Sequence, residues 1–318
     1  MKKKALITGI TGMVGSHLAD YILEHHPEHE VHGLTLWQVP FDNIQQILSQ
    51  VTLHYGDLRD LNSLIDTLRE SRPDWVFHLA AQSYVPYSFT APAETLGTNV
   101  IGTTNLLDAM RITGSEAKIH ICSSSEVYGQ VREDEVPITE TNPFRPASPY
   151  AVSKVAQDLL GRAYFLSYGT RVIITRMFTY INPRQKYLFQ TAFTKQIVDI
   201  ENGKKKVLQH GNLNSVRNFI DTEDAMKAYW LTAKRGKVGE IYNIGGNKVL
   251  SVKKFLSKLI KFSNVKIKTT TNKKLLRPAD VSFQIPNSNK FRKRMRWNPQ
   301  VSLELSIIKL FNYFRKNK

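Results

Sequence analysis

In the stretch SPYAVSKVAQ, residues 148 to 157, a tyrosine and a lysine stand four positions apart behind a proline. Proline is accepted at the first position of a helix, so Tyr150 and Lys154 are expected to lie one turn apart on one helix face. A phenol alone is a weak base at neutral pH, and a nearby ammonium is expected to lower its pKa by stabilising the phenolate. The pair could therefore remove the proton of a hydroxyl group. The alternative is two polar side chains on a solvated helix.

A second group of reactive side chains follows an apolar run in ICSSSEVYGQ, residues 121 to 130. Strands of a parallel sheet end at the ligand crevice, so Ser124, Ser125 and Glu126 are expected to face a bound ligand. The alternative is a turn built from serines with an acidic cap. Cys122 lies inside the predicted strand, where a thiol is usually packed and not a nucleophile.

A glycine-rich segment lies between the first predicted strand and the first predicted helix. Gly9, Gly12 and Gly15 have the spacing G-x-x-G-x-x-G, which lets the backbone approach a pyrophosphate at a helix N-terminus. Thr11, Met13 and Val14 complete this segment. It predicts a dinucleotide site for NADP or NAD.

The choice between NAD and NADP stays open at this point. The second predicted strand ends in LTLWQ, where Thr35, Leu36 and Trp37 supply neither the acid that binds a ribose nor the arginine that binds a 2′-phosphate. Asp57, after the third strand, is expected either to accept a hydrogen bond from the adenine amine or to cap a helix.

The elements that must position these residues alternate along the chain. Strand-like runs and helical patterns follow one another up to about residue 178, which predicts a Rossmann-type doubly wound parallel sheet. We expect residues 1–178 to form this dinucleotide-binding domain, with a segment near 214–247 returning to it. Residues 179–318 are expected to form a smaller, mostly C-terminal α/β substrate domain.

Composition narrows the class of protein. The chain has 318 residues, a net charge of +17 from 44 basic and 27 acidic residues, and a single cysteine, which excludes an internal disulfide. The N-terminus does not read as a secretory signal, and no run is long enough to cross a membrane, so a cytoplasmic location is expected. The charge could indicate an anionic partner, but the basic residues are dispersed, and nucleic acid is not expected. EHHPEHE, residues 24 to 30, is interrupted by Pro27, so no metal site is expected.

Several motifs together resemble a known family. TGxxGxxG at 8–15, HLAAQ at 78–82, NVIGT at 99–103, SSSEVYG at 123–129 and YxxxK at 150–154 are similar to extended short-chain dehydrogenase/reductases that act on nucleotide sugars. LHYGDL, AAQSYVPYSF, RPASPYAVSK and LLRPADV narrow the resemblance to the GDP-mannose 4,6-dehydratases and the related GDP-4-keto-6-deoxymannose reductases.

The resemblance implies roles for individual residues. Tyr150 would take the proton of the sugar 4-hydroxyl, Lys154 would also hold the cofactor ribose, Ser124 would relay the proton, and Glu126 would remove the C5 proton. Further cofactor contacts are expected from Asp57, Leu58, Leu79, Ala80 and Ala81. The expected substrate contacts are Ser83, Ser125, Thr179 and Arg184, together with Arg217 and Arg277, whose guanidinium groups suit the diphosphate.

Departures from the family pattern affect these expectations. The family usually reads close to FNHxxPRxG where this chain has FTYINPRQK, with Thr179 for Asn and Tyr180 for His, which puts the sugar in question. Leu36 stands where the dehydratases usually carry an arginine for the NADP phosphate. The resemblance implies a GDP-sugar 4,6-dehydratase working as a homodimer or homotetramer. The alternatives are a 4-keto reductase, an epimerase, or a dinucleotide-responsive binding protein.

Overall fold

The structure is a computed structural model that describes residues 2–185, 187–276 and 280–316. Its main element is a seven-stranded sheet in which every pairing is parallel. The strand order is β10-β6-β5-β4-β1-β2-β3. These strands are β1 (Lys4–Thr8), β2 (Glu30–Thr35), β3 (Val51–Tyr55), β4 (Trp75–His78), β5 (Lys118–Ser124), β6 (Val172–Met177) and β10 (Ile241–Ile244).

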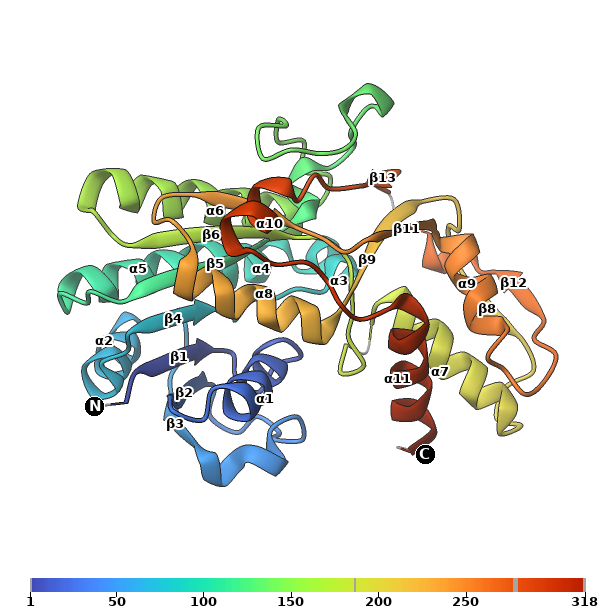
Figure 1. The fold of residues 1–318 in the computed structure, drawn as a ribbon, viewed down its shortest axis with the longest axis horizontal. Coiled ribbons are helices and arrows are strands. Elements are labelled where there is room, and N and C mark those ends of the chain that lie inside the picture. Colours follow the sequence, from blue (N-terminus) through green and yellow to red (C-terminus); the bar gives the residue numbers. More distant parts are fainter. Residues whose placement is uncertain (1, 186, 277–279, 317–318) are drawn as a thin grey trace.

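Helices cover both faces of this sheet, as Figure 1 shows. Alternate residues of one strand face opposite sides, so Ala5 and Ile7 pack toward one set of helices and Leu6 toward the other. One set is α1 (Gly15–His25), α8 (Thr222–Arg235) and α10 (Asn289–Met295), and the other is α2 (Leu61–Ser71), α5 (Gly102–Ile112) and α6 (Pro149–Tyr168). The predicted Rossmann-type α/β fold is confirmed.

The strand order reverses between β1 and β4, which are neighbours at the centre of the sheet. From β1 the chain builds outward through β2 and β3, then crosses back to add β4, β5 and β6 on the other side. In doubly wound sheets the ligand crevice lies at such a switch point, beyond the carboxyl ends of the strands. The glycine-rich segment follows β1, and the serine segment ends β5.

A smaller group of elements lies on the other side of this crevice, at the right of Figure 1. Its core is formed by residues such as Phe193, Phe219, Phe255 and Phe311. It contains the strands β7 (Tyr180–Ile181), β8 (Leu208–His210), β9 (Val216–Asp221), β11 (Lys248–Ser251), β12 (Thr269–Thr271) and β13 (Phe283–Gln284), with the helices α7 (Phe189–Glu201), α9 (Val252–Ile260) and α11 (Leu303–Lys316). β9 pairs with β7, β11 and β13. The chain then returns to the main part of the molecule, where α8 packs on one face of the main sheet and β10 is its edge strand.

The helix that carries Tyr150 and Lys154 has clear start and stop signals. Pro149 is its first residue, and the Ser148 side chain accepts a hydrogen bond from the amide of Ala151. The helix ends at Tyr168 and is capped by Gly169, whose φ of 69° is the left-handed conformation that suits glycine. Helix α6 therefore begins one residue before Tyr150, as the sequence predicts.

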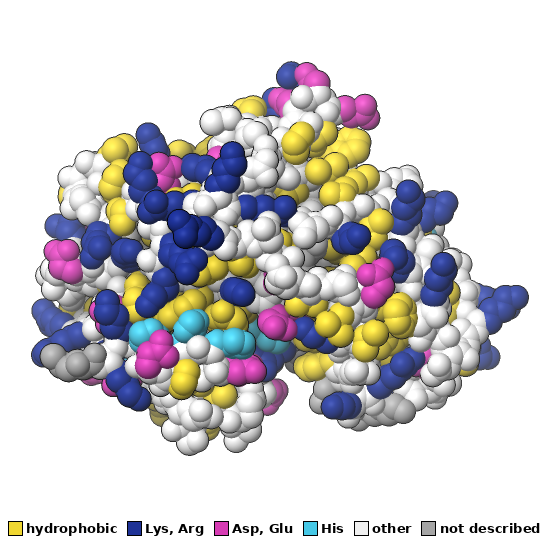
Figure 2. All heavy atoms as spheres, in the orientation of Figure 1, with side chains coloured by type: hydrophobic (Ala, Val, Ile, Leu, Met, Phe, Trp, Pro, Cys, Tyr) yellow, Lys and Arg dark blue, Asp and Glu magenta, His cyan; other side chains and the backbone are white. Residues whose placement is uncertain are grey.

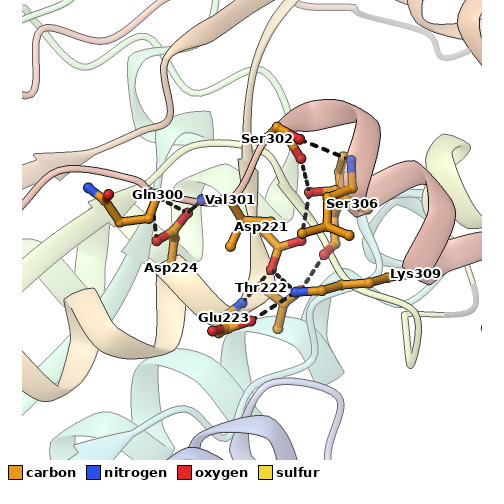
Figure 3. Close-up of polar contacts among 11 residues, drawn as sticks. Asp221, Thr222, Glu223, Asp224, Gln300, Val301, Ser302, Ser306 and Lys309 are labelled. Atoms are coloured by element: carbon orange, nitrogen blue, oxygen red, sulfur yellow. Dashed lines mark hydrogen bonds and ion pairs between the residues drawn. The ribbon is translucent and has the colours of Figure 1, made fainter.

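The start of α8 joins the two parts of the molecule, as Figure 3 shows. Asp221 caps α8 and also accepts a hydrogen bond of 2.6 Å from the Ser306 hydroxyl on α11. Asp224 accepts hydrogen bonds from the amides of Gln300 and Val301, which precede α11. These contacts attach the C-terminal helix to the strand β9 that leads back to the main sheet.

The remaining helices are short. α3 (Val85–Thr90) and α4 (Pro92–Leu96) precede a π-helical segment at Gly97–Ile101 that leads into α5, and a 3-10 turn at Ser125–Tyr128 follows β5. Further 3-10 turns lie at Gln45–Gln50, Glu133–Glu135 and Lys273–Leu275.

Basic side chains are spread over the visible face in Figure 2, with acidic ones between them and a row of histidines. In the segment EHHPEHE, His26 stacks on Trp230 with ring centroids 4.5 Å apart, and His29 meets the edge of Trp75 at 5.2 Å. Among the described residues, no group of three or more His, Cys, Asp or Glu side chains is placed to hold a metal ion. None of the described helices is long and apolar enough to span a bilayer.

Candidate active site

A cavity of about 980 Å³ opens at the switch point between the main sheet and the smaller group of elements. It is lined by the glycine-rich segment, by the residues after β3, β4 and β5, and by the N-terminal turn of α6. β9, α7 and the segment before β13 complete its far side. Its volume lies at the upper end of the range for ligand sites. Most of the predicted cofactor, catalytic and substrate residues meet in this one space.

The glycine-rich segment has the geometry of a pyrophosphate cradle. Gly9 has a φ of 70°, and a Cβ there would lie 2.9 Å from the Cα of Ala80. A Cβ on Gly15 would lie 2.3 Å from the carbonyl oxygen of Gly9. Helix α1 begins here without a side-chain cap, so its first amides can receive an anion. Together with Thr11, Met13 and Val14, which also line the cavity, these glycines fit a dinucleotide.

The adenosine end of the cavity lies beside β2 and β3. The hydroxyls of Thr11 and Thr35 are 3.3 Å apart, and Leu36, 48% exposed, lies next to them. Asp57 lines this end, but Arg59 binds its carboxylate at 2.6 Å and lowers its pKa. The helix that follows is capped by Asp60, so the N-cap alternative for Asp57 is wrong. Sequence reasoning missed Arg59 because GDLRD does not indicate which side chains pair.

The wall between the two ends of the cavity is held by buried polar contacts. Leu79 and Ala80 each donate an amide hydrogen bond of 3.1 Å to the Thr8 hydroxyl. His78 contacts the same hydroxyl at 3.0 Å, and burial lowers the pKa of this histidine to about 3. The predicted residues Leu58, Leu79, Ala80 and Ala81 all line the cavity.

The reactive side chains meet at the carboxyl end of β5. The ammonium of Lys154 donates a hydrogen bond of 2.9 Å to the main-chain oxygen of Cys122 and lies 5.8 Å from the centre of the Tyr150 ring. Tyr150 is hydrogen-bonded to the side chain of Ser124. The Ser124 hydroxyl also accepts a hydrogen bond of 3.2 Å from the amide of Glu126. Ser124, Glu126, Tyr150 and Lys154 therefore share one wall of the cavity.

The electrostatics of Tyr150 differ from the expectation. Burial is the largest influence on the phenol and raises its pKa, and the nearby Cys122 adds to this, while the hydrogen bond from Ser124 lowers it. The expected lowering of the pKa counted on Lys154 together with the positive nicotinamide of an oxidised cofactor, and the protein without ligand does not test it; in the protein alone, burial outweighs the nearby charges. Lys154 is itself buried, which lowers its own pKa, and its ammonium is directed to a backbone carbonyl. An additional positive charge beside Tyr150 would favour the phenolate.

Glu126 has a partner that no motif indicated. Gln284 on β13 donates a hydrogen bond of 2.9 Å from its side-chain amide to Oε1 of Glu126, across 158 residues of sequence. Both residues line the cavity, and so does the buried Ser125. The carboxylate is therefore fixed at the boundary between the two parts of the molecule.

The expected substrate residues are only partly brought together. Ser83, Thr179 and Arg217 line the cavity, and Arg217 faces Asp280 at 3.5 Å. Arg184 does not line it: its guanidinium binds Asp20 on α1 at 2.7 Å, so its predicted substrate contact is not supported by its position. The predicted Arg277 lies outside the described residues.

Two further tyrosines line the reactive end of the cavity. Tyr180 stands in the altered FTYINPR segment, and burial raises its pKa well above the ordinary value, with contributions from Cys122 and Tyr150. The hydroxyl of Tyr229 lies 3.0 Å from the sulfur of Cys122. Burial raises the pKa of this thiol, which agrees with a packed cysteine.

Comparison with known proteins agrees with this geometry. A family model described as GDP-mannose 4,6 dehydratase matches residues 6–310. The chain is 32% identical to the GDP-mannose 4,6-dehydratase of Yersinia enterocolitica, over 95% of this chain and 91% of that enzyme. It is 31% identical to the GDP-6-deoxy-D-mannose reductase of Pseudomonas aeruginosa, over 96% of this chain and 95% of that enzyme.

Solved structures show the same arrangement. RMD from Pseudomonas aeruginosa complexed with NADPH superposes with a TM-score of 0.87 and 28% identity, covering 99% of this chain and 100% of that one. DesIV, a dTDP-glucose 4,6-dehydratase from Streptomyces venezuelae with NAD and TYD bound, gives a TM-score of 0.88 and 28% identity, covering 99% and 97%. On the matched family model and these relatives, the chain belongs to the GDP-mannose 4,6-dehydratase family of extended short-chain dehydrogenase/reductases.

Proposed function

We propose that this protein is an NAD(P)-dependent GDP-sugar 4,6-dehydratase that converts GDP-mannose, or a related GDP-manno-sugar, to its 4-keto-6-deoxy product. The observation that carries this proposal is the position of Glu126. Its carboxylate lines the same cavity as Tyr150, Lys154 and Ser124, and Glu126 lies two residues after Ser124 in the 3-10 turn that follows β5. A carboxylate beside the tyrosine can remove a carbon-bound proton, which simple oxidation or reduction of a hydroxyl does not require.

The chemistry that NAD(P) supplies when bound is removal of a hydride from C4 of the sugar and its later return to C6. The residues of this chain move the protons. Tyr150 takes the proton of the 4-hydroxyl, with the hydrogen-bonded Ser124 as relay. Lys154 holds a positive charge beside the phenol ring. The glycine-rich segment binds the pyrophosphate, and Arg217 binds the substrate diphosphate.

Glu126 performs the step that distinguishes a dehydratase. Once C4 is a ketone, the proton on C5 is acidic because the carbanion is delocalised as an enolate. Glu126 removes this proton, the C6–oxygen bond breaks, and the hydroxyl leaves as water with that proton. When the hydride returned to C6, Tyr150 would release the proton taken from the 4-hydroxyl and C5 would gain one proton from solvent, so the protons balance. The sugar has lost one water, and the cofactor ends in its starting oxidation state.

The test is to incubate the purified protein with GDP-mannose and no added cofactor, and to follow the nucleotide sugar by mass spectrometry. A product lighter by one water is expected. Absence of this product, both without and with added NAD(P)⁺, would contradict the proposal.

A 4-keto reductase is the second candidate, favoured by the reductase relative at 31% identity and by the likeness to the NADPH complex of RMD. A reductase would leave GDP-mannose unchanged. It would instead consume added NADPH or NADH when given a GDP-4-keto-6-deoxy sugar, so the same assay with both substrates separates the two activities.

We also propose that the protein is a homodimer joined through α6. Val152, Leu159 and Leu166 lie seven residues apart along this helix and are 45, 54 and 65% exposed. Residues at this spacing form one stripe, and an exposed apolar stripe on a helix commonly marks a protein interface. The stripe faces away from the sheet that α6 covers. A cytoplasmic location fits the single cysteine, which is a free thiol.

A further inference from the structure

We propose that Gln284 is a positioning residue for Glu126: its amide holds one carboxylate oxygen and thereby fixes the direction in which the other meets the sugar. This inference rests on the proposed function, in which Glu126 moves the proton of C5. The side-chain amide of Gln284 donates its hydrogen bond to Glu126, so its effect on the reaction passes through that carboxylate.

The contact is well placed for this role. Nε2 of Gln284 lies 2.9 Å from Oε1 of Glu126, and Gln284 is only 3% exposed although it lines the cavity. A buried amide has few alternative partners, so the hydrogen bond persists. A glutamate side chain that is held in this way loses less freedom when the substrate binds, and proton transfer from carbon is sensitive to small misplacements.

The strand that carries Gln284 also connects Glu126 to the diphosphate site. β13 pairs in parallel with β9, and Gln284 stands beside Arg217 in that pairing. The residue that orients the base and the residue proposed to hold the diphosphate therefore lie on adjacent strands. The sugar is attached to the diphosphate, so this arrangement sets its C5 at a defined position relative to Glu126.

An amide suits this task better than a charged partner. A neutral N–H donor fixes the carboxylate without neutralising its charge, so Glu126 can still take up a proton and release it. An arginine or lysine in the same place would form an ion pair and oppose protonation of the carboxylate. A leucine would fill the space without holding the oxygen.

A neighbouring contact supplies a matched control. Gln130 and Ser282 join the same two segments, with Gln130 Nε2 at 2.8 Å from the Ser282 hydroxyl and the Ser282 amide at 3.1 Å from Gln130 Oε1. Gln130 lies outside the cavity lining. Gln130→Ala therefore weakens the attachment of the segment after β5 to β13 without removing the hydrogen bond to Glu126.

The experiment compares Gln284→Leu, Gln284→Glu and Gln130→Ala with the unchanged protein on GDP-mannose. It measures three quantities: water loss by mass spectrometry, deuterium uptake at C5 in D₂O, and absorbance of reduced nicotinamide during one turnover. We expect Gln284→Leu to slow water loss and C5 exchange about tenfold, the usual effect of losing a hydrogen bond to a charged group. KM should change less than twofold, and reduced nicotinamide should accumulate because oxidation at C4 outpaces elimination.

The remaining variants distinguish a change in the orientation of Glu126 from a general loosening of the fold around it. Gln284→Glu places a second carboxylate against Glu126 and should lose water more slowly than Gln284→Leu. Gln130→Ala should lose water and exchange the C5 proton at the same rates as the unsubstituted protein. Equal rates of C5 exchange in Gln284→Leu and the unchanged protein would overturn the inference. So would the same slowing in Gln130→Ala, since that would indicate simple loosening of the segment. If the unchanged protein itself releases no water from GDP-mannose, the proposed function fails, which is a separate result visible before any variant is made.

Discussion

The ammonium of Lys154 donates a hydrogen bond to the main-chain oxygen of Cys122, 2.9 Å away. This bond joins helix α6 to β5 close to the carboxyl end of the strand. This contact holds a positive charge beside Tyr150, next to the end of β5 where Ser124 and Glu126 lie. Burial nevertheless raises the pKa of Tyr150 in the protein alone. Burial thus favours the protonated phenol in the protein alone, whereas a positive charge brought by a bound ligand would favour the phenolate.

Tyr150→Phe should reduce turnover of GDP-mannose by about 10³-fold, since a positioned acid or base contributes roughly 10²–10⁴ to the rate. The reason is that the proton of the 4-hydroxyl then has no acceptor. The measurement is water loss followed by mass spectrometry, with cofactor binding checked by thermal shift. Tyr168→Phe, which removes an exposed phenol at the other end of the same helix, is the matched control. Turnover within tenfold of the unchanged protein in Tyr150→Phe would rule out this base.

The main sheet was predictable because its signals are local. Each strand is a short apolar run, and glycine spacing and the proline before Tyr150 mark the turns that carry the site. The predicted catalytic and cofactor residues come from these segments, and the structure brings Ser124, Tyr150 and Lys154 to one cavity. Their common location follows from one rule, that strands of a parallel sheet end at the same edge.

The residues that were missed come from distant segments without a motif. Gln284 reaches Glu126 across 158 residues, and only the pairing of β13 with β9 brings it there. Arg184 is among the expected substrate contacts, yet its guanidinium binds Asp20 on α1. The raised pKa of Tyr150 depends on burial, which spacing between residues does not report.

Leu36→Arg should improve binding of NADP relative to NAD about tenfold. In the unchanged protein the adenosine end presents Leu36 and two threonine hydroxyls, and the one guanidinium among its described lining residues, that of Arg59, is paired with Asp57. A 2′-phosphate carries a charge of about −1.5 to −2 and gains little there, whereas a 2′-hydroxyl fits. We therefore expect NADH to bind at least as tightly as NADPH before the change.

Dissociation constants for NADH and NADPH, measured by nicotinamide fluorescence, test this expectation. Trp37→Arg adds the same charge one residue further on, outside the cavity lining, and should have a smaller effect. Tighter binding of NADPH than of NADH by the unsubstituted protein would show that the adenosine end of the cavity accepts a 2′-phosphate, contrary to this expectation.

Arg217→Lys should raise KM for GDP-mannose about tenfold while kcat changes little. A lysine keeps the charge but loses the two parallel N–H donors that suit a diphosphate. Initial rates of water loss over a range of substrate concentrations give both constants. Arg171→Lys, at an exposed position, is the control. A fall in kcat with unchanged KM would instead assign Arg217 to the chemical step.

Leu159→Glu should convert the proposed dimer to a monomer. The substitution places a charge at the centre of the exposed stripe on α6, where burial against a second copy would leave it unpaired. Sedimentation velocity of the two proteins at equal concentration measures the change. Ser257→Glu, at an exposed position of α9 in the smaller group of elements, adds the same single negative charge elsewhere and should leave the mass unchanged. A monomeric unchanged protein would refute the proposal directly.

Acid should destabilise the fold through buried histidines. Burial lowers the pKa of both His78 and His120 from 6.5 to about 3, so between these values the unfolded chain binds protons that the folded chain does not. Stability is therefore full above pH 6.5 and falls as the pH drops toward 3, by about 2 kcal/mol for each histidine at pH 5.

Urea unfolding at pH 7 and pH 5 measures this loss, and His120→Asn tests its origin. The asparagine does not titrate, whereas the imidazole that it replaces, whose Nε2 lies 2.7 Å from the Thr175 hydroxyl, does. The variant should lose about 2 kcal/mol less stability than the unchanged protein between the two pH values. His25→Asn, at an exposed position, should leave the difference as it is. An identical loss in His120→Asn and the unchanged protein would mean that His120 is charged in the folded state, contrary to its complete burial beside Tyr229.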